Sequence, residues 1–147
     1  MKKFGILFAV AVVLNMTACA EKKTAITVNQ LPQPAQTLLT TYFSDLQVAM
    51  AVKETEMGET EYIVSYTDAT QVKFNKKGEW KEVDRPMGKT VPDGIVPEQI
   101  RTYVATTFPN TTIQEIDKDR RGGYDVKLSN RMEIEFNDRF LPIEMDD

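Results

Sequence analysis

The sequence predicts an α+β protein made of two tandem repeats, each with one helix packed on a roughly four-stranded antiparallel sheet. Three observations predict this class. The stretch VPEQIRTYVATTFP at residues 96–109 matches LPQPAQTLLTTYFS at residues 31–44 with an offset of 65 residues. A second match joins residues 61–80 to residues 123–140, where the offset falls to 62. Within each half, the apolar residues recur first at helical spacing and then at alternating spacing.

The first element of each repeat is a predicted amphipathic helix. Its apolar residues recur at steps of three and four, which places them along one stripe of the helix surface. They are Ala35, Leu38, Leu39 and Phe43 in the first repeat, and Ile100, Tyr103, Val104 and Phe108 in the second. A proline lies in the first turn of both helices, where a missing N–H costs nothing, and Pro109 ends the second.

The segments that follow each helix predict antiparallel strands. Apolar residues alternate there with polar ones, so that one side of each strand is buried. The predicted inward residues are Tyr62, Val64, Tyr66, Val72 and Phe74 in the first repeat, and Tyr124, Val126, Leu128, Ile134 and Phe136 in the second. Turn sequences such as TDAT, NKKG and DRRGG separate the strands. Trp80 and Phe140, near the last strands, are expected in the core rather than at an interface.

Composition shifts and the limits of the two matches set the predicted boundaries. The predicted units are residues 1–18 (signal peptide), 19–30 (tether), 31–85 (repeat 1), 86–95 (linker) and 96–147 (repeat 2). The linker contains two prolines and two glycines, which favour an irregular connection. For the tether, a short leading strand through Ile26 and Val28 is the alternative.

Residues 1–18 have the pattern of an export signal. Lys2 and Lys3 form a basic start, and an apolar run from Phe4 to Leu14 follows. This run is too short to cross a hydrocarbon core, which needs about 20 residues. The pattern therefore predicts a signal peptide and not a membrane span.

Two cleavage sites are open. MTAC at residues 16–19 matches a lipobox, in which the thiol of Cys19 is acylated and the signal is removed just before it; Cys19 is the one cysteine of the chain. This predicts a lipoprotein in the periplasm or at the outer membrane, in contact with the membrane only through its N-terminal lipid. Alternatively, Ala18 and Ala20 form an A-x-A site, and a soluble periplasmic chain begins at Glu21.

The same residues carry a resemblance to a known family. LPQPAQTLLTTYF with YIVSYTDATQVKFNKKGEWKEVD, and VPEQIRTYVATTFP with YDVKLSNRMEIEFNDRF, resemble the PepSY-like, β-lactamase-inhibitor-like proteins of the bacterial envelope, over residues 31–147. The resemblance implies tandem helix-plus-four-strand modules whose helices cover one sheet face and leave the other bare. It also implies export and, by analogy with inhibitor relatives, binding of another protein. It transfers no catalytic or ligand-binding motif to single residues.

The composition excludes several kinds of chemistry. The chain has no histidine, so catalysis by Ser-His-Asp or Cys-His groups is excluded and zinc loses its usual ligands. Without Lys2 and Lys3 the chain carries 16 basic and 22 acidic side chains, a balance that argues against nucleic acid as a partner. Glu133 and Glu135 form a carboxylate pair that a glycosidase could use, but any solvated strand shows such alternation. We therefore expect neither an enzyme nor a cofactor.

Outward side chains of the predicted strands form the candidate partner surface. They are Ile63, Lys73, Lys127, Glu133 and Glu135. The leading prediction is a non-catalytic exported module that recognises, or recognises and inhibits, another envelope protein through these exposed sheet faces. Simple solvation of charged side chains is the competing explanation.

The segment DKDRRGGYD imitates the beginning of a calcium-binding loop. Asp117, Asp119 and Asp125 are its candidate ligands, but Arg121 occupies the next ligand position and Leu128 stands where a bidentate glutamate is needed. A metal site is therefore not expected, and an ordinary hairpin turn accounts for the segment. The alternative function that this segment leaves open is a periplasmic sensor or carrier of calcium or a small ligand.

Overall fold

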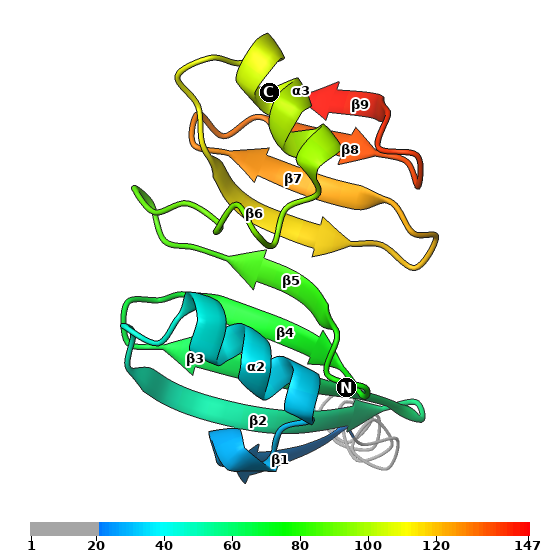
Figure 1. Cartoon of the computed structure of the whole chain (residues 1–147). Coiled ribbons are helices and arrows are strands. Elements are labelled where there is room, and N and C mark those ends of the chain that lie inside the picture. The colour runs from blue at the N-terminus through cyan, green and yellow to red at the C-terminus, as the bar shows by residue number, and fades with distance from the viewer. Residues whose placement is uncertain (1–20) are drawn as a thin grey trace, which may run out of the picture.

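The computed structural model describes residues 21–147, which form a single antiparallel sheet of nine strands and two α-helices (Figure 1). The strands are β1 (Lys22–Ile26), β2 (Val48–Glu56), β3 (Glu59–Tyr66), β4 (Gln71–Asn75), β5 (Trp80–Asp84), β6 (Ile113–Lys118), β7 (Tyr124–Leu128), β8 (Glu133–Phe136) and β9 (Pro142–Asp146). The helices are α2 (Gln33–Tyr42) and α3 (Glu98–Thr107), and a 3-10 turn, η1 (Val28–Gln30), precedes α2.

The prediction of two repeats, each with its own four-stranded sheet, is wrong. The strand order is β1 to β9 without interruption, and β5 pairs with β6 through Glu82 with Asp117, Val83 with Ile116 and Asp84 with Glu115. Alternation in a sequence identifies strands, but it does not show which strand lies at an edge. Pairing β5 with β6 satisfies the backbone N–H and C=O groups that two separate sheets would each have left exposed.

Both predicted helices are present, and both lie on the same side of the sheet (Figure 1). Each begins directly after a proline, Pro32 for α2 and Pro97 for α3, whose own backbone is extended, with ψ at 147° and 137°. The residues that each helix buries come from its predicted apolar stripe: Ala35 and Leu39 in α2, Ile100 and Val104 in α3. We call the covered side of the sheet the helix face and the opposite side the open face.

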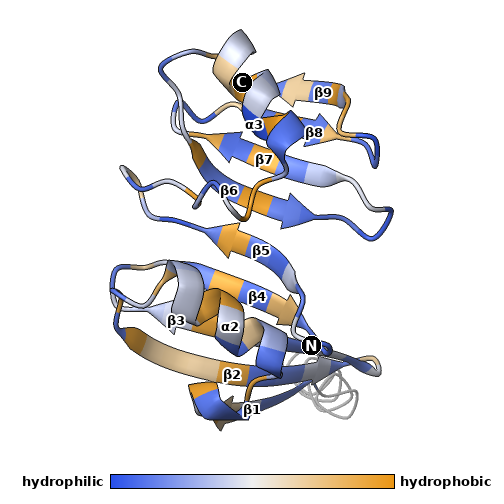
Figure 2. Cartoon of the chain, viewed as in Figure 1, coloured by the Kyte–Doolittle hydropathy of each residue, from blue (hydrophilic) through white to orange (hydrophobic). Residues whose placement is uncertain are grey.

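An apolar row crosses the whole sheet on the helix face. One register partner from each strand contributes to it: Ile26, Ala51, Val64, Val72, Val83, Ile116, Val126, Ile134 and Met145. The seven members from Ala51 to Ile134 are buried, whereas Met145, at the β9 edge, is 51% exposed. The row joins the two halves into one hydrophobic core, and Figure 2 shows the apolar bands that it makes in successive strands.

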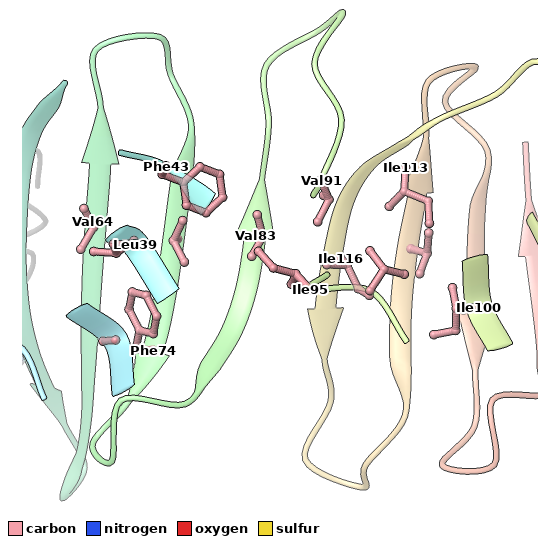
Figure 3. Close-up of a cluster of buried hydrophobic side chains, with 14 of the residues drawn as sticks. Leu39, Phe43, Val64, Phe74, Val83, Val91, Ile95, Ile100, Ile113 and Ile116 are labelled. Atoms are coloured by element: carbon pink, nitrogen blue, oxygen red, sulfur yellow. The ribbon is translucent and has the colours of Figure 1, made fainter. Parts of the chain in front are cut away.

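The segment predicted as a linker, residues 86–95, packs over the junction of β5 and β6. Val91 and Ile95 are buried, and Figure 3 shows them beside Val83 and Ile116. The backbone N–H of Val91 donates to the carbonyl of Ile113 at 2.8 Å. The connection is therefore irregular in backbone but part of the core.

The N-terminal predictions fall partly outside the described residues. The signal peptide at 1–18 and the lipidation site Cys19 lie outside them. Of the segment expected as a tether or a short leading strand, residues 22–26 form β1, which pairs with β2, and Val28 lies in the 3-10 turn. Within residues 21–147, no helix has both the length and the apolar character needed to span a membrane.

Candidate functional site: the open face of the sheet

Register partners on the open face form a row whose chemistry changes along the sheet. From β1 to β9 the row is Ala25, Val52, Ile63, Lys73, Glu82, Asp117, Asp125, Glu135 and Glu144. None of the described helices lies over this side (Figure 1). The row is apolar over β1 to β3 and carries a carboxylate on every strand from β5 to β9. Five adjacent strands therefore present acidic side chains in line.

A second open-face row runs beside the first and thickens the acidic region. From β5 to β9 it contains Asp84, Glu115, Lys127, Glu133 and Asp146. Over β6 to β9 the two rows surround a shallow hollow of about 330 Å³, which we call the acidic hollow. Besides Val126 and Ile134, it is lined by seven carboxylates and one lysine: Glu115, Asp117, Asp125, Glu133, Glu135, Glu144, Asp146 and Lys127.

The carboxyl groups in and beside the acidic hollow disfavour one another's charge. Burial, followed by the charges of Glu82 and Asp125, raises the pKa of Asp117. Burial, followed by the charges of Asp84 and Glu82, raises the pKa of Glu115. The pKa values of Asp84 and Asp125 are raised in the same way, with burial as the first cause. The charged form of this surface is therefore costly, and a bound cation would relieve the cost.

Basic partners are distributed unevenly over the open face. Lys73 pairs with Glu82 at 2.9 Å, and Lys81 contacts Glu61. None of the seven carboxylates of the acidic hollow forms an ion pair with any residue of 21–147. The acidic hollow therefore gathers negative charge that no ion pair within the described residues neutralises.

The five residues of the predicted partner surface all lie on the open face, in two groups. Ile63 and Lys73 are register partners on β3 and β4. Lys127, Glu133 and Glu135 line the acidic hollow on β7 and β8. Their role in binding stays a prediction, because position alone does not show a partner.

Sequence reasoning missed most of the acidic hollow as a surface. The sequence patterns single out neither Glu115 nor Glu144, and they present Asp117 only as a metal ligand. A signal was present, since IQEIDK at 113–118 and PIEMD at 142–146 both place acids at alternate positions. What the sequence could not show is that strands from separate hairpins bring these acids into line.

The three candidate calcium ligands do not lie around one point: two are on the open face of the sheet, and the third holds a turn. Asp117 and Asp125 are register partners on β6 and β7. The Oδ1 atom of Asp119 instead accepts hydrogen bonds from the backbone N–H groups of Arg121 (2.6 Å) and Gly123 (2.9 Å), and so it holds the hairpin turn. The segment is thus a β-hairpin rather than a loop that gathers its carboxylates around one point.

A different acidic trio meets the geometric requirement for an ion. Among the described residues, carboxylate oxygens of Glu21, Glu54 and Glu56 lie within 4.8 Å of one another. Lys23 already contacts Glu21 at 2.8 Å and Glu54 at 3.7 Å. This lysine supplies positive charge to the trio, which therefore has a partner within the chain.

Trp80 and Phe140 both pack against the same tyrosine, Tyr124. The ring centroid of Tyr124 is 6.3 Å from that of Trp80 and 5.6 Å from that of Phe140. Both aromatic side chains are partly buried against the core, and the Nζ atom of Lys118 lies 3.8 Å from the Trp80 ring centroid. Their expected role in packing agrees with these contacts.

The fold and the open face together define a small mixed α and β protein whose helices cover one side of a long antiparallel meander. The chain belongs to the PepSY-like family: a family model described as "Putative beta-lactamase-inhibitor-like, PepSY-like" matches residues 60–143. The predicted family is therefore confirmed. No curated protein matches the sequence.

Solved structures from Bacteroides share the fold. A protein of the DUF2874 family from Bacteroides vulgatus, described as a "putative periplasmic protein", is 42% identical, with a TM-score of 0.82 over 86% of this chain and 98% of the other. A "putative calcium-regulated periplasmic protein" from Bacteroides thetaiotaomicron is 39% identical, with a TM-score of 0.81 over 85% and 97%. These descriptions support the predicted periplasmic location; the lipid anchor stays a prediction.

Proposed function

We propose that this protein is a non-catalytic periplasmic module that binds another envelope protein through its open face, with the acidic hollow against a basic surface of the partner. The observation that carries the proposal is the line of carboxylates across five adjacent strands, from Glu82 on β5 to Glu144 on β9. The carboxylates of the acidic hollow lack ion pairs within the described chain.

The energetics favour a binding role over a structural one. Clustered carboxylates with raised pKa values cost folding stability at neutral pH, because the folded state must hold charges that the unfolded chain keeps apart. Residues that destabilise a fold while facing solvent are typical of functional surfaces. A basic partner removes the repulsion on association and is also attracted over a distance.

The apolar part of the open face adds area next to the charge. Val52 and Ile63 are register partners and partly buried, and Met50 beside them is exposed. Interfaces commonly combine an apolar patch with a charged region that fixes orientation. The family's inhibitor-like description supports recognition of a protein. Val52 and Ile63 would supply contact area, and the acidic hollow would select the partner.

A capture experiment tests this function. Envelope proteins are passed over the immobilised folded domain, and the retained partner is then titrated by calorimetry. The test variant Asp117→Asn/Asp125→Asn/Glu135→Gln removes three charges from the acidic hollow. The control variant Asp45→Asn/Asp93→Asn/Asp138→Asn removes three charges from exposed loop residues.

We expect the natural sequence and the control to retain the same protein, and the test variant to bind it at least about tenfold more weakly. Added salt should weaken binding of the natural sequence, because exposed charge pairs are screened. If both variants retain the partner protein equally, or if added salt does not change its affinity, the acidic hollow is not the recognition surface.

Calcium is a second candidate ligand for the same surface. One observation favours it: a relative 39% identical over 85% of this chain is described as calcium-regulated. Carboxylates are the ligands that Ca²⁺ prefers, and Asp117 and Asp125 lie opposite each other. The trio of Glu21, Glu54 and Glu56 offers ligands elsewhere, so the two sites must be separated.

Calorimetry with CaCl₂, using MgCl₂ as the control salt, tests the calcium candidate. If the acidic hollow holds calcium, Asp117→Asn/Asp125→Asn abolishes uptake and Glu54→Gln/Glu56→Gln preserves it. Calcium at about 100 times its dissociation constant would also stabilise the fold by about 2.7 kcal/mol. Calcium uptake by Asp117→Asn/Asp125→Asn, or equal uptake of magnesium by the natural sequence, would exclude a calcium site in the acidic hollow.

A further inference from the structure

We infer that the free edge of β9 is a docking surface for an extended segment of a partner protein, with an apolar residue at its centre and a basic residue on either side. The segment would add to the sheet as a tenth, antiparallel strand. This inference concerns the edge of the sheet and does not rest on the function proposed for the open face.

The first step is that β9 has the same pattern and setting as β5. Each follows a strand to which it pairs through four positions, with a bulge at the same place: between Lys73 and Phe74 for β5, and between Glu135 and Phe136 for β9. After the bulge, β5 reads Glu82, Val83, Asp84 and β9 reads Glu144, Met145, Asp146. In both triplets the central residue belongs to the apolar row of the helix face.

The second step is that the triplet of β5 pairs with a second neighbouring strand, β6, whereas the triplet of β9 has no second neighbour among residues 21–147. Val83 pairs with Ile116 of β6 and is 0% exposed, because β6 and residues 86–95 cover it. Met145 is 51% exposed, and its neighbour Ile143 is 58% exposed. β9 pairs only with β8 and forms one end of the sheet in Figure 1. The same backbone geometry that binds β6 is therefore available there.

The third step concerns the protection that edge strands normally carry. Sheet edges are commonly blocked by lysines or covered by another element. The opposite edge, β1, carries Lys22 and Lys23, whereas β9 contains no basic residue. Its bulge does not prevent pairing, because β5 has the equivalent bulge and still binds β6. Pro142, the first residue of β9, has no N–H to offer, but the residues from Ile143 to Asp146 do and include no lysine. Over these residues β9 is the less protected edge, and its backbone groups suit strand addition.

The fourth step identifies the partner by charge. Glu144 and Asp146 point to the open face beside Glu135 and Glu133, their register partners. Neither Glu144 nor Asp146 forms an ion pair within residues 21–147. At the β5–β6 pairing, the acidic Asp117 and Glu115 of β6 lie opposite Glu82 and Asp84, and Lys73 offsets the charge of Glu82. Glu144 and Asp146 have no such lysine within residues 21–147, so we expect a docking strand to bring its own cations opposite them and an apolar side chain opposite Met145.

Charge also argues against a second copy of this chain as the occupant through its own β9. Two β9 strands side by side would bring four carboxylates, Glu144 and Asp146 from each copy, to one seam. Like charges on neighbouring strands are destabilising, and where the acids of β5 and β6 face each other Lys73 offsets Glu82, whereas the residue beside Glu144 on β8 is Glu135. The segment we infer is therefore part of another protein, with a lysine or arginine on each side of an apolar residue.

A peptide of eight alternating lysine and valine residues, with blocked ends, is the probe. The control peptide has the same composition, with all lysines preceding all valines. Hydrogen exchange of the protein's backbone amides, followed by NMR, locates binding. We expect the alternating peptide to slow exchange of amides within β9 and to leave those of β1 unchanged.

Three variants make the test specific. Met145→Lys should weaken peptide binding at least about tenfold, while Met57→Lys, which adds the same charge at a residue 96% exposed, should not. In the acidic-hollow variant Asp117→Asn/Asp125→Asn/Glu135→Gln, the alternating peptide should still slow exchange of the β9 amides. This result separates strand addition from attraction to the open face. Equal binding of the two peptides, equal loss in both methionine variants, no protection of β9, or a dimer formed through β9 would overturn the inference.

Discussion

At the scale of single residues, the open face combines partial burial with unbalanced charge. Asp117 and Asp125 face each other across β6 and β7, and the pKa of each is raised, first by burial and then by neighbouring carboxylates. On the turn between β3 and β4, Asp68 behaves in the opposite way. Hydrogen bonds from Thr70 and the charge of Arg85 outweigh burial and lower its pKa. Asp68 therefore stabilises the fold when it is charged, whereas Asp117 and Asp125 favour the fold when they are protonated.

Neutralising the facing pair should stabilise the protein at neutral pH. A carboxyl whose pKa is raised by folding contributes most stability below its ordinary pKa, and that contribution is lost as pH rises through its folded pKa. Asp117→Asn/Asp125→Asn should therefore raise the melting temperature at about pH 7, and the gain should shrink toward about pH 4. Thermal melts across this range measure it. A similar gain in the loop variant Asp45→Asn/Asp138→Asn would contradict the explanation.

Ala69 in the β3–β4 turn is held in a conformation that favours glycine. Its φ is 76°, in the left-handed region, and its side chain is exposed. Ala69→Gly should raise the free energy of unfolding by about 1 kcal/mol, because alanine pays a steric cost there that glycine does not. Denaturant titration measures the change. Ala105→Gly, on the exposed side of α3, should lower stability by about 1 kcal/mol; loss in both variants would refute the prediction.

At the scale of elements, the pairing of β5 with β6 makes one sheet of the two halves. The sequence predicted the helices and the alternation of the strands, because both follow from local apolar spacing. It could not predict this pairing. The triplets Glu82, Val83, Asp84 and Glu144, Met145, Asp146 have the same pattern, yet one is interior and the other forms an edge. Whether a strand gains a second neighbour depends on the rest of the chain and not on its own residues.

Truncating the apolar side chain at this junction should be costly. Ile116 is fully buried between β5 and β7, so Ile116→Ala should lower the free energy of unfolding by about 2–5 kcal/mol through lost contacts and the cavity left behind. Ile143→Ala removes the same atoms from an exposed site on β9 and should change stability by less than about 0.5 kcal/mol. Guanidinium titration compares the two. A small effect at Ile116 would mean that the junction is not part of the core.

At the scale of the whole molecule, one core supports both halves, and the candidate site exists only in the assembled sheet. The outward direction of Lys127, Glu133 and Glu135 was predictable from alternation. The acidic hollow was not, because β9 and β6 contribute to it from separate hairpins. Register between hairpins is a property of the folded sheet, which a local pattern does not encode.

Unfolding should therefore follow a single transition. Trp80, the one tryptophan, lies on β5 and contacts Tyr124 of β7, so its fluorescence reports on the region between the halves. We expect the fluorescence transition to coincide with that of far-UV circular dichroism in a denaturant titration. Ile116→Ala should shift both transitions together. Two separated transitions would show that the halves unfold independently.

The strictly sequential strand order also determines how the molecule carries tension. β1 and β9 lie at opposite edges, and every strand is bonded only to its neighbours in the chain. A pull between the two ends therefore crosses all the strand pairings one after another, so the weakest of them sets the force that the sheet withstands. The β5–β6 pairing has three register pairs, the fewest of any. Val91 and Ile95 are packed over that seam, so separating the halves there would also have to break their apolar contacts.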